Sequence, residues 1–546
     1  MDFRSGFPHS FAVIAPTPEN RGAPEPFRLG SFWVFLILGL ILRTVALQQP
    51  LMDAMMYRQA QTASVTQGLA EQPGWPIAAN VHWLGDKQAK ILLELPLYNY
   101  LVLGVNKIAG NLDISGKLTS VLLWGLSFFL LQGIWAKLLS KEHIFWANLL
   151  FVLSPLEVFY GQAFMPEMLI QALSFGFVGA LLSYAEQPGT LRFLTWALLG
   201  LLGMLIKVPE FLHLYVFSAL VFFARDRWKT LSNWRYWAAI LITALAVKLW
   251  GNITSEINAS AIPEWTPAAI LPGFIGSLGM RLDPWRIFKL LQYPPILIFT
   301  IPGTLLVLLG AGVLWKARPF RDFASRMTVF WIFALIFFYL FWAGTVAWTQ
   351  AYYNLPAVPV FCVLFALGMV ALLRWGQKKS ALWLQPRVMG PAVSLLLLPF
   401  LVGGNLFQFN QDQRVLYEAA IWLRDHTPQT DLALVVANHH PNLIRYRHLS
   451  IVSYYSERRI WAITPDFAGQ EREHALATAK WAIVTHPAQL TSSVERLRRA
   501  FRKTGFPAQD ISWLETAGFH KLGEGNSFSI YVKTPLSVSP AGGAGE

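Results

Sequence analysis

The chain has 546 residues, of which 54% are hydrophobic and only 14% are charged, and its formal net charge is +13. A composition this apolar excludes a soluble enzyme of this size and indicates a polytopic α-helical membrane protein. A basic excess can signal nucleic-acid binding, but most Lys and Arg residues outside the C-terminal part lie in short loops between apolar runs. Membrane topology explains these residues better, so we expect no nucleic-acid partner.

The two ends of the chain differ from the apolar middle. Residues 1–30 carry Arg4, Arg21 and Arg28 but no continuous apolar core, so we expect a disordered cytoplasmic tail and no signal peptide. Apolar segments recur over residues 31–405, and the rest of the chain is polar. This change in composition predicts one domain boundary.

Eleven apolar runs approach the roughly 20 residues that a bilayer crossing needs. They lie near residues 31–48, 118–136, 144–160, 166–184, 191–206, 209–224, 234–251, 293–315, 327–347, 355–373 and 388–405. A twelfth candidate, residues 95–110, is shorter and contains Pro96, Asn99, Asn106 and Lys107. The single cysteine, Cys362, lies inside an apolar run, so we expect it to pack and to form neither a disulfide nor a metal site.

The charges of the loops decide the status of residues 95–110. If this segment does not span and the N-terminus is cytoplasmic, every strongly basic short loop falls inside, as the positive-inside rule requires. The basic residues of these loops are Lys137, Lys141, Arg192, Arg225, Arg227, Lys229, Arg235, Lys316, Arg318, Arg321, Arg326, Arg374, Lys378, Lys379 and Arg387. We therefore expect residues 95–110 to form a helix that lies in the membrane interface with its apolar face down.

This topology places three long segments on the outer side: residues 49–117, residues 252–292 and everything after about residue 406. The last of these combines helical stretches with short β-rich runs, such as those that begin at residues 432, 481 and 527, which predicts a small α/β domain with at least four strands. Its expected helices cover residues 412–426, 470–479 and 488–504. The expected organisation is thus a tail (1–30), a transmembrane catalytic domain (31–405) with a periplasmic first loop (49–117), a periplasmic α/β domain (406–535) and a disordered tail (536–546).

Polar residues crowd the first loop directly after the first crossing. Asp53 is followed by Arg58, Gln59 and Gln61 on what we expect to be a short interfacial helix. Ionisable groups at the edge of a membrane are costly and are functional candidates for that reason. The alternative is that Asp53 only caps the helix that follows, with its carboxylate accepting backbone N–H groups.

A second carboxylate lies in the turn between two predicted crossings, in FYGQAFMPEMLI at residues 159–170. Glu167 follows Pro166 in the first turn of a helix, where a negative charge is also favoured by the helix dipole. The predicted topology places Glu167 on the same side as Asp53, and two carboxylates at one boundary suit acid–base or cation chemistry. Glu94 is a third carboxylate at this level, or else it only anchors the interfacial helix.

Lys207, in MLIKVPEF, lies between two crossings with almost no loop and on the predicted outer side. It breaks the charge bias of the other short loops and so needs a local partner. That partner is an anion such as a lipid phosphate, or the side chain snorkels to ordinary phospholipids. Glu210 and His213 follow about one turn later, and either could pair with Lys207.

The turn TQAYYNLPAVP, residues 349–359, contains Tyr352, Tyr353 and Asn354. These residues are candidates for sugar or phosphate contacts, although aromatic residues at this level are commonly interface anchors. His439 and His440 invite a metal interpretation, but adjacent residues at a strand end point to opposite faces and no third ligand accompanies them. We expect no metal site there.

The order of these segments resembles the PMT-like membrane glycosyltransferases of the GT-C class, which include protein O-mannosyltransferases and lipid A aminoarabinose transferases. The resemblance rests on YRQAQTA, ELPLYNYL, LSPLEVFYGQAFMPE, IKVPEF and YYNLP, and it covers about residues 31–405. The first motif is similar to the bacterial pattern W-R-Q-x-D-T-A, with Gln61 in place of the aspartate. Glu167 replaces the aspartate that is usual in M-P-D. The α/β tail is also similar to the bacterial branch.

The resemblance implies transfer of a sugar, with inversion, from a polyprenyl-phosphate carrier to a glycan, lipid or protein acceptor at the outer face of the bacterial inner membrane. By this carry-over Asp53 is the base, Glu167 is the second carboxylate, and Lys207 and Arg58 contact the phosphate. The substrate contacts expected beside them are Glu94, Gln59, Gln61, Tyr160, Tyr352, Tyr353 and Asn354. The resemblance requires no cofactor, and it leaves open whether Asp53 and Glu167 share a divalent cation.

Two other functions would use a similar site. A flippase or transporter of lipid-linked sugars should show inverted repeats and interrupted helices near the midplane, which the sequence does not indicate. A polysaccharide polymerase with a pyrophosphate-linked donor would have to bind two phosphates, and the single outer lysine and arginine favour one. The α/β domain could in addition bind the acceptor.

Overall fold

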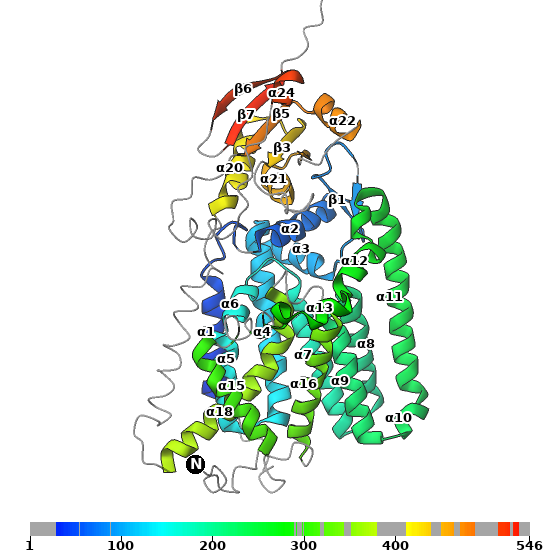
Figure 1. The fold of residues 1–546 in the computed structure, drawn as a ribbon, viewed down its shortest axis with the longest axis vertical. Helices are drawn as coiled ribbons and strands as arrows, with labels where there is room; N and C mark the ends of the chain where they lie inside the picture. The colour runs from blue at the N-terminus through cyan, green and yellow to red at the C-terminus, as the bar shows by residue number, and fades with distance from the viewer. Residues whose placement is uncertain are drawn as a thin grey trace, which may run out of the picture. The chain divides into compact units, whose positions relative to one another are not determined.

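The computed structural model describes residues 29–378 and 411–533, apart from 54, 88, 289–290, 292–297, 299, 317–321, 343–350, 438–448, 464–469, 486–511 and 525–527. The chain forms two compact units (Figure 1). The helical unit comprises Met1–Gln49 and Leu92–Phe407, and the mixed unit comprises Pro50–Ile91 and Gln408–Glu546. Most of the residues of the first loop thus cluster with the C-terminal part of the chain.

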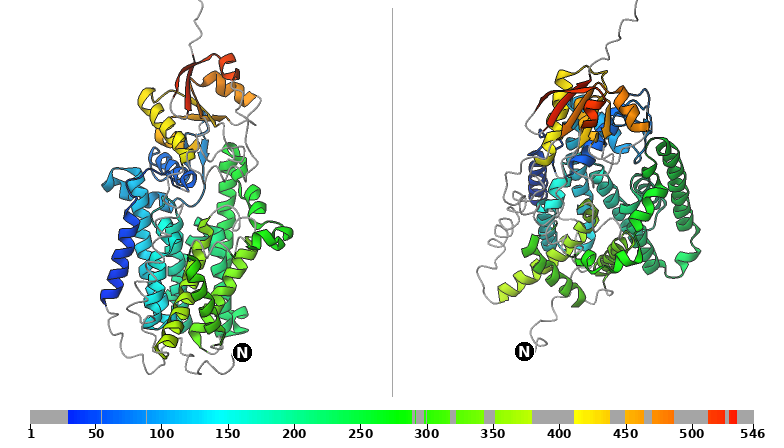
Figure 2. Two further views of the ribbon diagram at one scale, coloured as in Figure 1. Left: turned by 60° about the vertical axis from the view of Figure 1, so that its left-hand side comes forward. Right: turned by 45° about the horizontal axis from the view of Figure 1, so that its top comes forward.

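The helical unit is built from long helices that run side by side (Figures 1 and 2). Its helices are α1 (Leu29–Thr44), α3 (Leu97–Ala109), α4 (Leu112–Leu138), α5 (Lys141–Leu153), α6 (Pro155–Tyr160), α7 (Glu167–Glu186), α8 (Thr190–Ile206), α9 (Val208–Asp226), α10 (Lys229–Ser232), α11 (Trp234–Ala261), η3 (Pro263–Trp265), α12 (Pro267–Ile275), α13 (Leu278–Leu282), α15 (Thr300–Lys316), α16 (Phe323–Phe341), η4 (Ala351–Ala357) and α18 (Val358–Lys378). Among the described residues, six helices are long and apolar enough to cross a membrane: α4, α7, α9, α11, α16 and the continuous stretch Ala351–Lys378.

The described parts of the predicted crossings from 31–48 to 355–373 fall mainly on these helices. Residues 293–297, 299 and 343–347 of two crossings, and the whole of the last crossing, 388–405, lie outside the described residues. The run 144–160, predicted as one crossing, forms two helices, α5 and α6, which are separated at Ser154. Ser154 has a ψ of 124°, far from helical, because the ring of Pro155 disfavours the α conformation in the residue before it.

The predicted separate helix at residues 95–110 is confirmed as α3. It ends at Gly110, whose φ of +67° is the left-handed conformation that glycine adopts readily. Asn111 then begins α4, and its side chain accepts the backbone N–H of Ile114 at 3.0 Å. The hydroxyl of Tyr98 donates to the Gly116 carbonyl at 3.0 Å, which docks α3 on α4.

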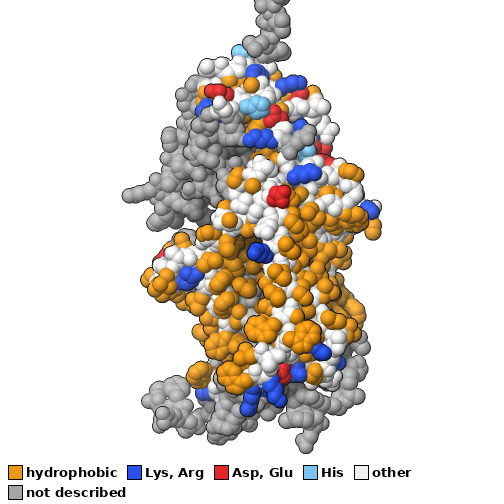
Figure 3. Space-filling view, turned by 90° about the vertical axis from the view of Figure 1, so that its right-hand side faces the viewer, with side chains coloured by type: hydrophobic (Ala, Val, Ile, Leu, Met, Phe, Trp, Pro, Cys, Tyr) orange, Lys and Arg blue, Asp and Glu red, His pale blue; other side chains and the backbone are white. Residues whose placement is uncertain are grey.

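The flank of the helical unit is covered by hydrophobic side chains (Figure 3). Only 11% of the most apolar 18-residue stretch of α11 is buried inside the protein, and Leu241, Leu245 and Leu249 are exposed. Such a surface is stable against lipid but not against water. In the same view lysines and arginines gather at one end of the helical flank, as expected for a membrane protein with charged loops.

Helices α15 and α18 cross at very close range. A Cβ atom on Gly310 would lie 1.8 Å from the Leu364 carbonyl oxygen, and one on Gly368 would lie 1.9 Å from that of Leu306. Glycines at such crossings let two membrane helices bring their backbones into contact. Because η4 leads directly into α18, this crossing fixes the segment that carries Tyr352 and Tyr353.

The described residues of the mixed unit form two sheets. Strands β1 (Ala79–Val81) and β2 (Ala89–Ile91) form an antiparallel pair. Strands β3 (Ala433–Ala437), β4 (Ile460–Ile463), β5 (Trp481–Thr485), β6 (Phe519–Glu524) and β7 (Phe528–Lys533) form a sheet in the order β4-β3-β5-β7-β6. Strand β3 is parallel to both of its neighbours, whereas β7 is antiparallel to β5 and β6.

The helices of the mixed unit are α2 (Met56–Ala70), α20 (Gln411–His426), α21 (Leu449–Ser456), α22 (Gln470–Thr478) and α24 (Ser512–Thr516). The predicted strands at 432, 481 and 527 and the predicted helices at 412–426 and 470–479 are confirmed. The predicted helix at 488–504 lies outside the described residues.

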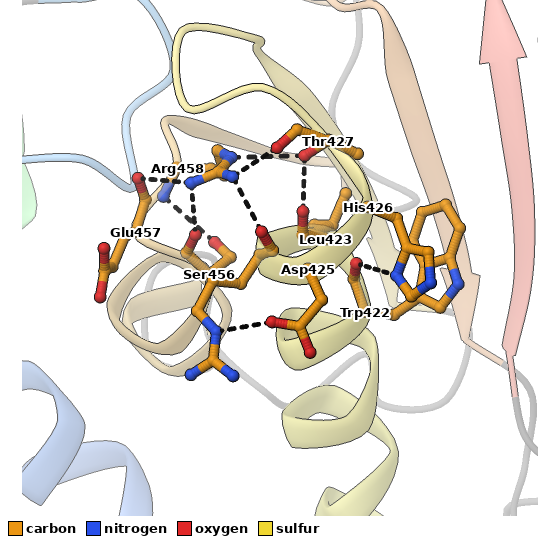
Figure 4. A network of polar contacts seen from close by, with 9 residues as sticks. Trp422, Leu423, Asp425, His426, Thr427, Ser456, Glu457 and Arg458 are labelled. Carbon is orange, nitrogen blue, oxygen red and sulfur yellow. Dashed lines mark hydrogen bonds and ion pairs between the residues drawn. The ribbon is translucent and has the colours of Figure 1, made fainter.

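A buried arginine joins α20 to the α21–β4 segment (Figure 4). Arg458 is 5% exposed, and its guanidinium donates to the carbonyls of Arg424 at 3.1 Å, Thr427 at 2.5 Å and Ser456 at 3.0 Å. Carbonyls at the end of a helix have no partner within the helix. Arg458 supplies donors for the end of α20 and holds it against the sheet.

Replacing Arg458 by Leu should therefore destabilise the mixed unit by about 2 kcal/mol or more, because several buried carbonyls would lose a charged donor. Thermal unfolding of the full chain in detergent measures this loss. The matched control is Arg424→Ala, since Arg424 pairs at the surface with Asp425 and such pairs add little. Equal stability of the two variants would contradict the assigned role.

Candidate active site

Two helix breaks place charged side chains inside the helical unit. Helix α8 ends at Ile206 and α9 begins at Val208, so Lys207 lies alone between them with an extended backbone (φ −155°, ψ 91°). Pro209 suits the first turn of α9 because the missing N–H would have no helical partner there. At the second break, Glu167 is the first residue of α7 and follows Pro166.

Lys207 forms a buried ion triad with two carboxylates. Its Nζ donates to Glu167 Oε1 at 2.7 Å and Oε2 at 2.9 Å. It also lies 2.6 Å from Oε1 of Glu210, as an ion pair that lacks hydrogen-bond alignment. The exposed fractions are 8% for Lys207, 1% for Glu167 and 2% for Glu210. The snorkelling alternative for Lys207 is therefore wrong, and pairing with Glu210 is confirmed.

The triad carries one excess negative charge when all three groups are ionised, since two carboxylates face one ammonium. Burying three charges costs more than their attraction returns unless the geometry is good, so such groups persist mainly where they have a function. Glu94 also interacts electrostatically with Lys207 and adds a further negative charge near the triad.

Aromatic rings complete the contacts of Lys207. Its Nζ lies 4.0 Å from the ring centroid of Tyr352 and 5.3 Å from that of Tyr353, which stabilises the cation. Tyr160 packs edge-on against Tyr352, with 5.9 Å between centroids. Asn354 is held by a hydrogen bond from the hydroxyl of Tyr339 at 3.1 Å.

The tyrosines of this turn do not form a lipid-facing belt. Tyr352 is 3% exposed and Tyr353 is 2% exposed, so both rings are enclosed by the protein. The structure thus brings the candidate residues Glu167, Lys207, Tyr352 and Tyr353 together, with Tyr160 next to them.

A small pocket of about 20 Å³ lies beside the triad, which is space for about one water molecule. Its lining comprises Glu167, Ile170, Gln171, Ser174, Phe175, Glu210, His213, Leu214, Trp331, Leu355 and Pro356. The lining combines apolar walls with a few polar groups, as the linings of small-ligand sites do. Sequence reasoning did not single out the pocket residues Gln171 and Ser174 because they fall within an apolar run.

Four polar atoms of the pocket lining have no hydrogen-bond partner among the described residues: Oε1 of Gln171, Nδ1 of His213, Nε1 of Trp331 and Oε1 of Glu210, the last of which is ion-paired with Lys207. The amide nitrogen of Gln171 donates to Glu157 Oε1 at 2.6 Å, which fixes the orientation of the amide. Buried polar atoms are normally satisfied by protein, water or ligand. The pocket therefore offers an acceptor and an imidazole nitrogen to a polar ligand.

The first-loop candidates form a second group, in the mixed unit. Asp53 Oδ1 accepts the backbone N–H of Met55 at 2.9 Å and the amide of Gln59 at 2.6 Å. Arg58 Nη1 donates to Gln61 Oε1 at 2.7 Å. The N–H that Asp53 accepts belongs to Met55, the N-cap residue of α2, and no side chain caps the helix, so the capping alternative is not confirmed. The two glutamines hold the carboxylate and the guanidinium in fixed orientations.

The two groups belong to different compact units, so the expected convergence of Asp53 with Glu167 and Lys207 stays a prediction. Within the described residues no group of three or more His, Cys, Asp or Glu side chains is arranged to hold a metal ion. The cation expected between Asp53 and Glu167 also stays a prediction, and His439 and His440 lie outside the described residues. Cys362 is fully buried in α18, as expected for a packing residue.

Comparison with known proteins gives a fold. No protein-family model matches the chain, and no curated protein matches it in sequence. Among solved structures, ArnT from Cupriavidus metallidurans bound to undecaprenyl phosphate matches with a TM-score of 0.60 and 12% sequence identity. The match covers 93% of this chain and 99% of that chain. The apo state of the same ArnT matches with a TM-score of 0.53, 10% identity and the same coverage.

An overlap of nearly the whole of both chains includes the helices as well as the C-terminal sheet. The short motifs led us to expect a GT-C fold, and the comparison confirms this fold. The chain has the PMT-like GT-C glycosyltransferase fold.

Proposed function

We propose that this protein is an inverting glycosyltransferase that moves a sugar from a polyprenyl-phosphate donor to an acceptor at the periplasmic face of the bacterial inner membrane. The observation that carries the proposal is the buried triad of Glu167, Lys207 and Glu210 beside a pocket in a membrane-embedded unit. The fold supports it, because one structure with this fold is described as bound to undecaprenyl phosphate.

In the proposed reaction an acceptor hydroxyl oxygen attacks the anomeric carbon from the face opposite the phosphate. The bond from that carbon to the phosphate oxygen breaks, and polyprenyl phosphate leaves with the bonding electrons. Asp53 takes the hydroxyl proton as general base. Its two observed hydrogen bonds, from Met55 and Gln59, orient the carboxylate for this step.

The leaving phosphate gains negative charge and needs a positive partner. Arg58 and Lys207 are the candidates. The ammonium of Lys207 already contacts three carboxylate oxygens, so a phosphate that reaches it must displace one of them. Arg58 is half-buried, and its Nη1 donates to Gln61 Oε1 at 2.7 Å; it is the proposed first contact for the donor phosphate.

Replacing Asp53 by Asn should abolish transfer, with a loss of roughly 10²-fold or more, and leave expression and donor-lipid binding largely intact. The carboxamide oxygen of Asn can still accept the bond from Met55, so the start of α2 should be preserved. Release of polyprenyl phosphate from a polyprenyl-phosphate sugar, with the purified protein in detergent, measures transfer. This assay also separates a transferase from a flippase, which releases none.

The matched control for that experiment is Asp425→Asn, which removes an exposed carboxylate of the same unit. It should turn over at the wild-type rate. Near-wild-type turnover in Asp53→Asn would remove the assigned base.

The triad makes a separate prediction about stability. Replacing Lys207 by Met leaves two buried carboxylates without a counter-charge. It should lower the free energy of unfolding by about 3–5 kcal/mol. Replacing Glu210 by Gln leaves one ammonium facing one carboxylate and should cost far less. Thermal unfolding in detergent compares the stability of the two variants. Equal destabilisation would show that Lys207 does not stabilise the two buried carboxylates.

A further inference from the structure

Residues 50–91 and the C-terminal part of the chain form one compact unit although more than 300 residues separate them. Helix α2, which follows Asp53, packs on α21 of the C-terminal part. The hydroxyl of Ser64 in α2 donates to the Ser450 carbonyl in α21 at 3.3 Å. Only two positions before Asp53, the backbone N–H of Leu51 donates to the hydroxyl of Tyr455 at 2.7 Å.

A second contact joins the later part of the loop to the sheet. Strand β4 is at the edge of the five-stranded sheet, where its outer N–H and C=O groups would lack partners. The first loop supplies them: Gly85 N–H donates to the Ile460 carbonyl, and Ile460 N–H donates to the His82 carbonyl, each at 2.8 Å. The segment 82–85 thus covers the beginning of this edge.

This contact requires a glycine. Gly85 has a φ of +65°, and a Cβ atom there would lie 2.0 Å from Cε2 of Trp461. Trp461 is 3% exposed and belongs to the hydrophobic core of the C-terminal sheet, so its indole has little freedom to move. The loop backbone therefore fits directly against the indole ring.

Charged side chains surround this contact at the surface. His474 Nε2 and Asp86 Oδ2 are 2.8 Å apart, and Nζ of Lys87 lies 5.7 Å from the centroid of the Trp461 ring. Both contacts are exposed enough to add little energy. They help to orient the loop on the sheet, whereas the backbone hydrogen bonds and the buried ring of Trp461 supply most of the stability of the contact.

We propose that the C-terminal α/β part is a positioning element for the proposed catalytic loop: α21 and β4 hold residues 51–85 so that Asp53 has one fixed orientation. The inference rests on the proposed function, because it assigns no new reaction. Loops are mobile unless a rigid scaffold supports them, and a displacement of about 1 Å at a reacting group can cost roughly 10²-fold in rate. Gly85, Trp461 and Tyr455 are positioning residues in this scheme, with no contact to substrate assigned.

The central test compares Gly85→Ala with Gly74→Ala. Both glycines have positive φ, +65° and +76°, but a Cβ on Gly74 meets nothing within 4 Å. The two variants share the backbone strain and differ in the collision with Trp461. Gly85→Ala should lower kcat by about 10-fold or more, with KM for the donor within about 2-fold of wild type, whereas Gly74→Ala should stay close to wild type.

Hydrogen exchange supplies a readout that does not depend on activity. Amides of α2, residues 56–70, should exchange faster in Gly85→Ala than in Gly74→Ala, because their support on the C-terminal part is weakened. A Trp461→Leu background removes the ring that Ala would meet, so Gly85→Ala should have a smaller effect there.

The outcomes separate the two proposals. Faster exchange in α2 with unchanged kcat would overturn the positioning role while leaving the function intact. Unchanged exchange in Gly85→Ala would overturn the docking itself. A wild-type protein that transfers no sugar would defeat the proposed function, and with it the catalytic part of this inference.

Tyr455→Phe tests the contact nearest to Asp53. It keeps the ring, which packs edge-on against Tyr417 with 4.8 Å between centroids, and removes the acceptor for Leu51 N–H. We expect a several-fold fall in kcat with KM for the donor unchanged. An unchanged kcat, or a rise in KM alone, would exclude Tyr455 from the positioning role.

Discussion

The position of one ammonium group between two carboxylates determines much of what the helical unit can do. Lys207 comes from the junction of α8 and α9, Glu167 from the start of α7 and Glu210 from the first turn of α9. None of these groups is stable alone in a low-dielectric interior, so each requires the others. The triad therefore joins α7 to the α8–α9 junction, and the rings of Tyr352 and Tyr353 join η4 to the same point.

Sequence reasoning found the charges but not all of their partners. Glu167 and Lys207 were recognisable because an ionisable residue next to an apolar run is conspicuous, and Glu210 lies within i,i+3 reach of Lys207. The pairing of Glu167 with Lys207 could not be derived, because 40 positions separate them and hydropathy does not say which helices are neighbours. Gln171 was overlooked for a different reason. A single amide in an apolar helix gives no signal until the helix packing shows that Glu157 and the pocket flank it.

The same limitation applies to the mixed unit. The helical stretches and β-rich runs after residue 405 predicted the α/β structure of the C-terminal part correctly. The change in composition, however, could only divide the chain at one point in the sequence. Residues 50–91 follow α1 in sequence, and only the contacts of Leu51, Ser64 and Gly85 show that this segment clusters with α21 and β4. Strand β4 has only 4 residues, too few for an alternating pattern to identify it.

The covered edge of the sheet has a practical consequence for work on fragments. A C-terminal piece that begins near residue 408 would lack residues 82–85, and the N–H and C=O groups of Ile460 would face water along with an uncovered Trp461. Open edges of this kind invite strand-to-strand association between copies. A soluble piece intended for crystallisation or NMR should therefore carry residues 50–91 on the same polypeptide, fused through a short linker to the C-terminal part.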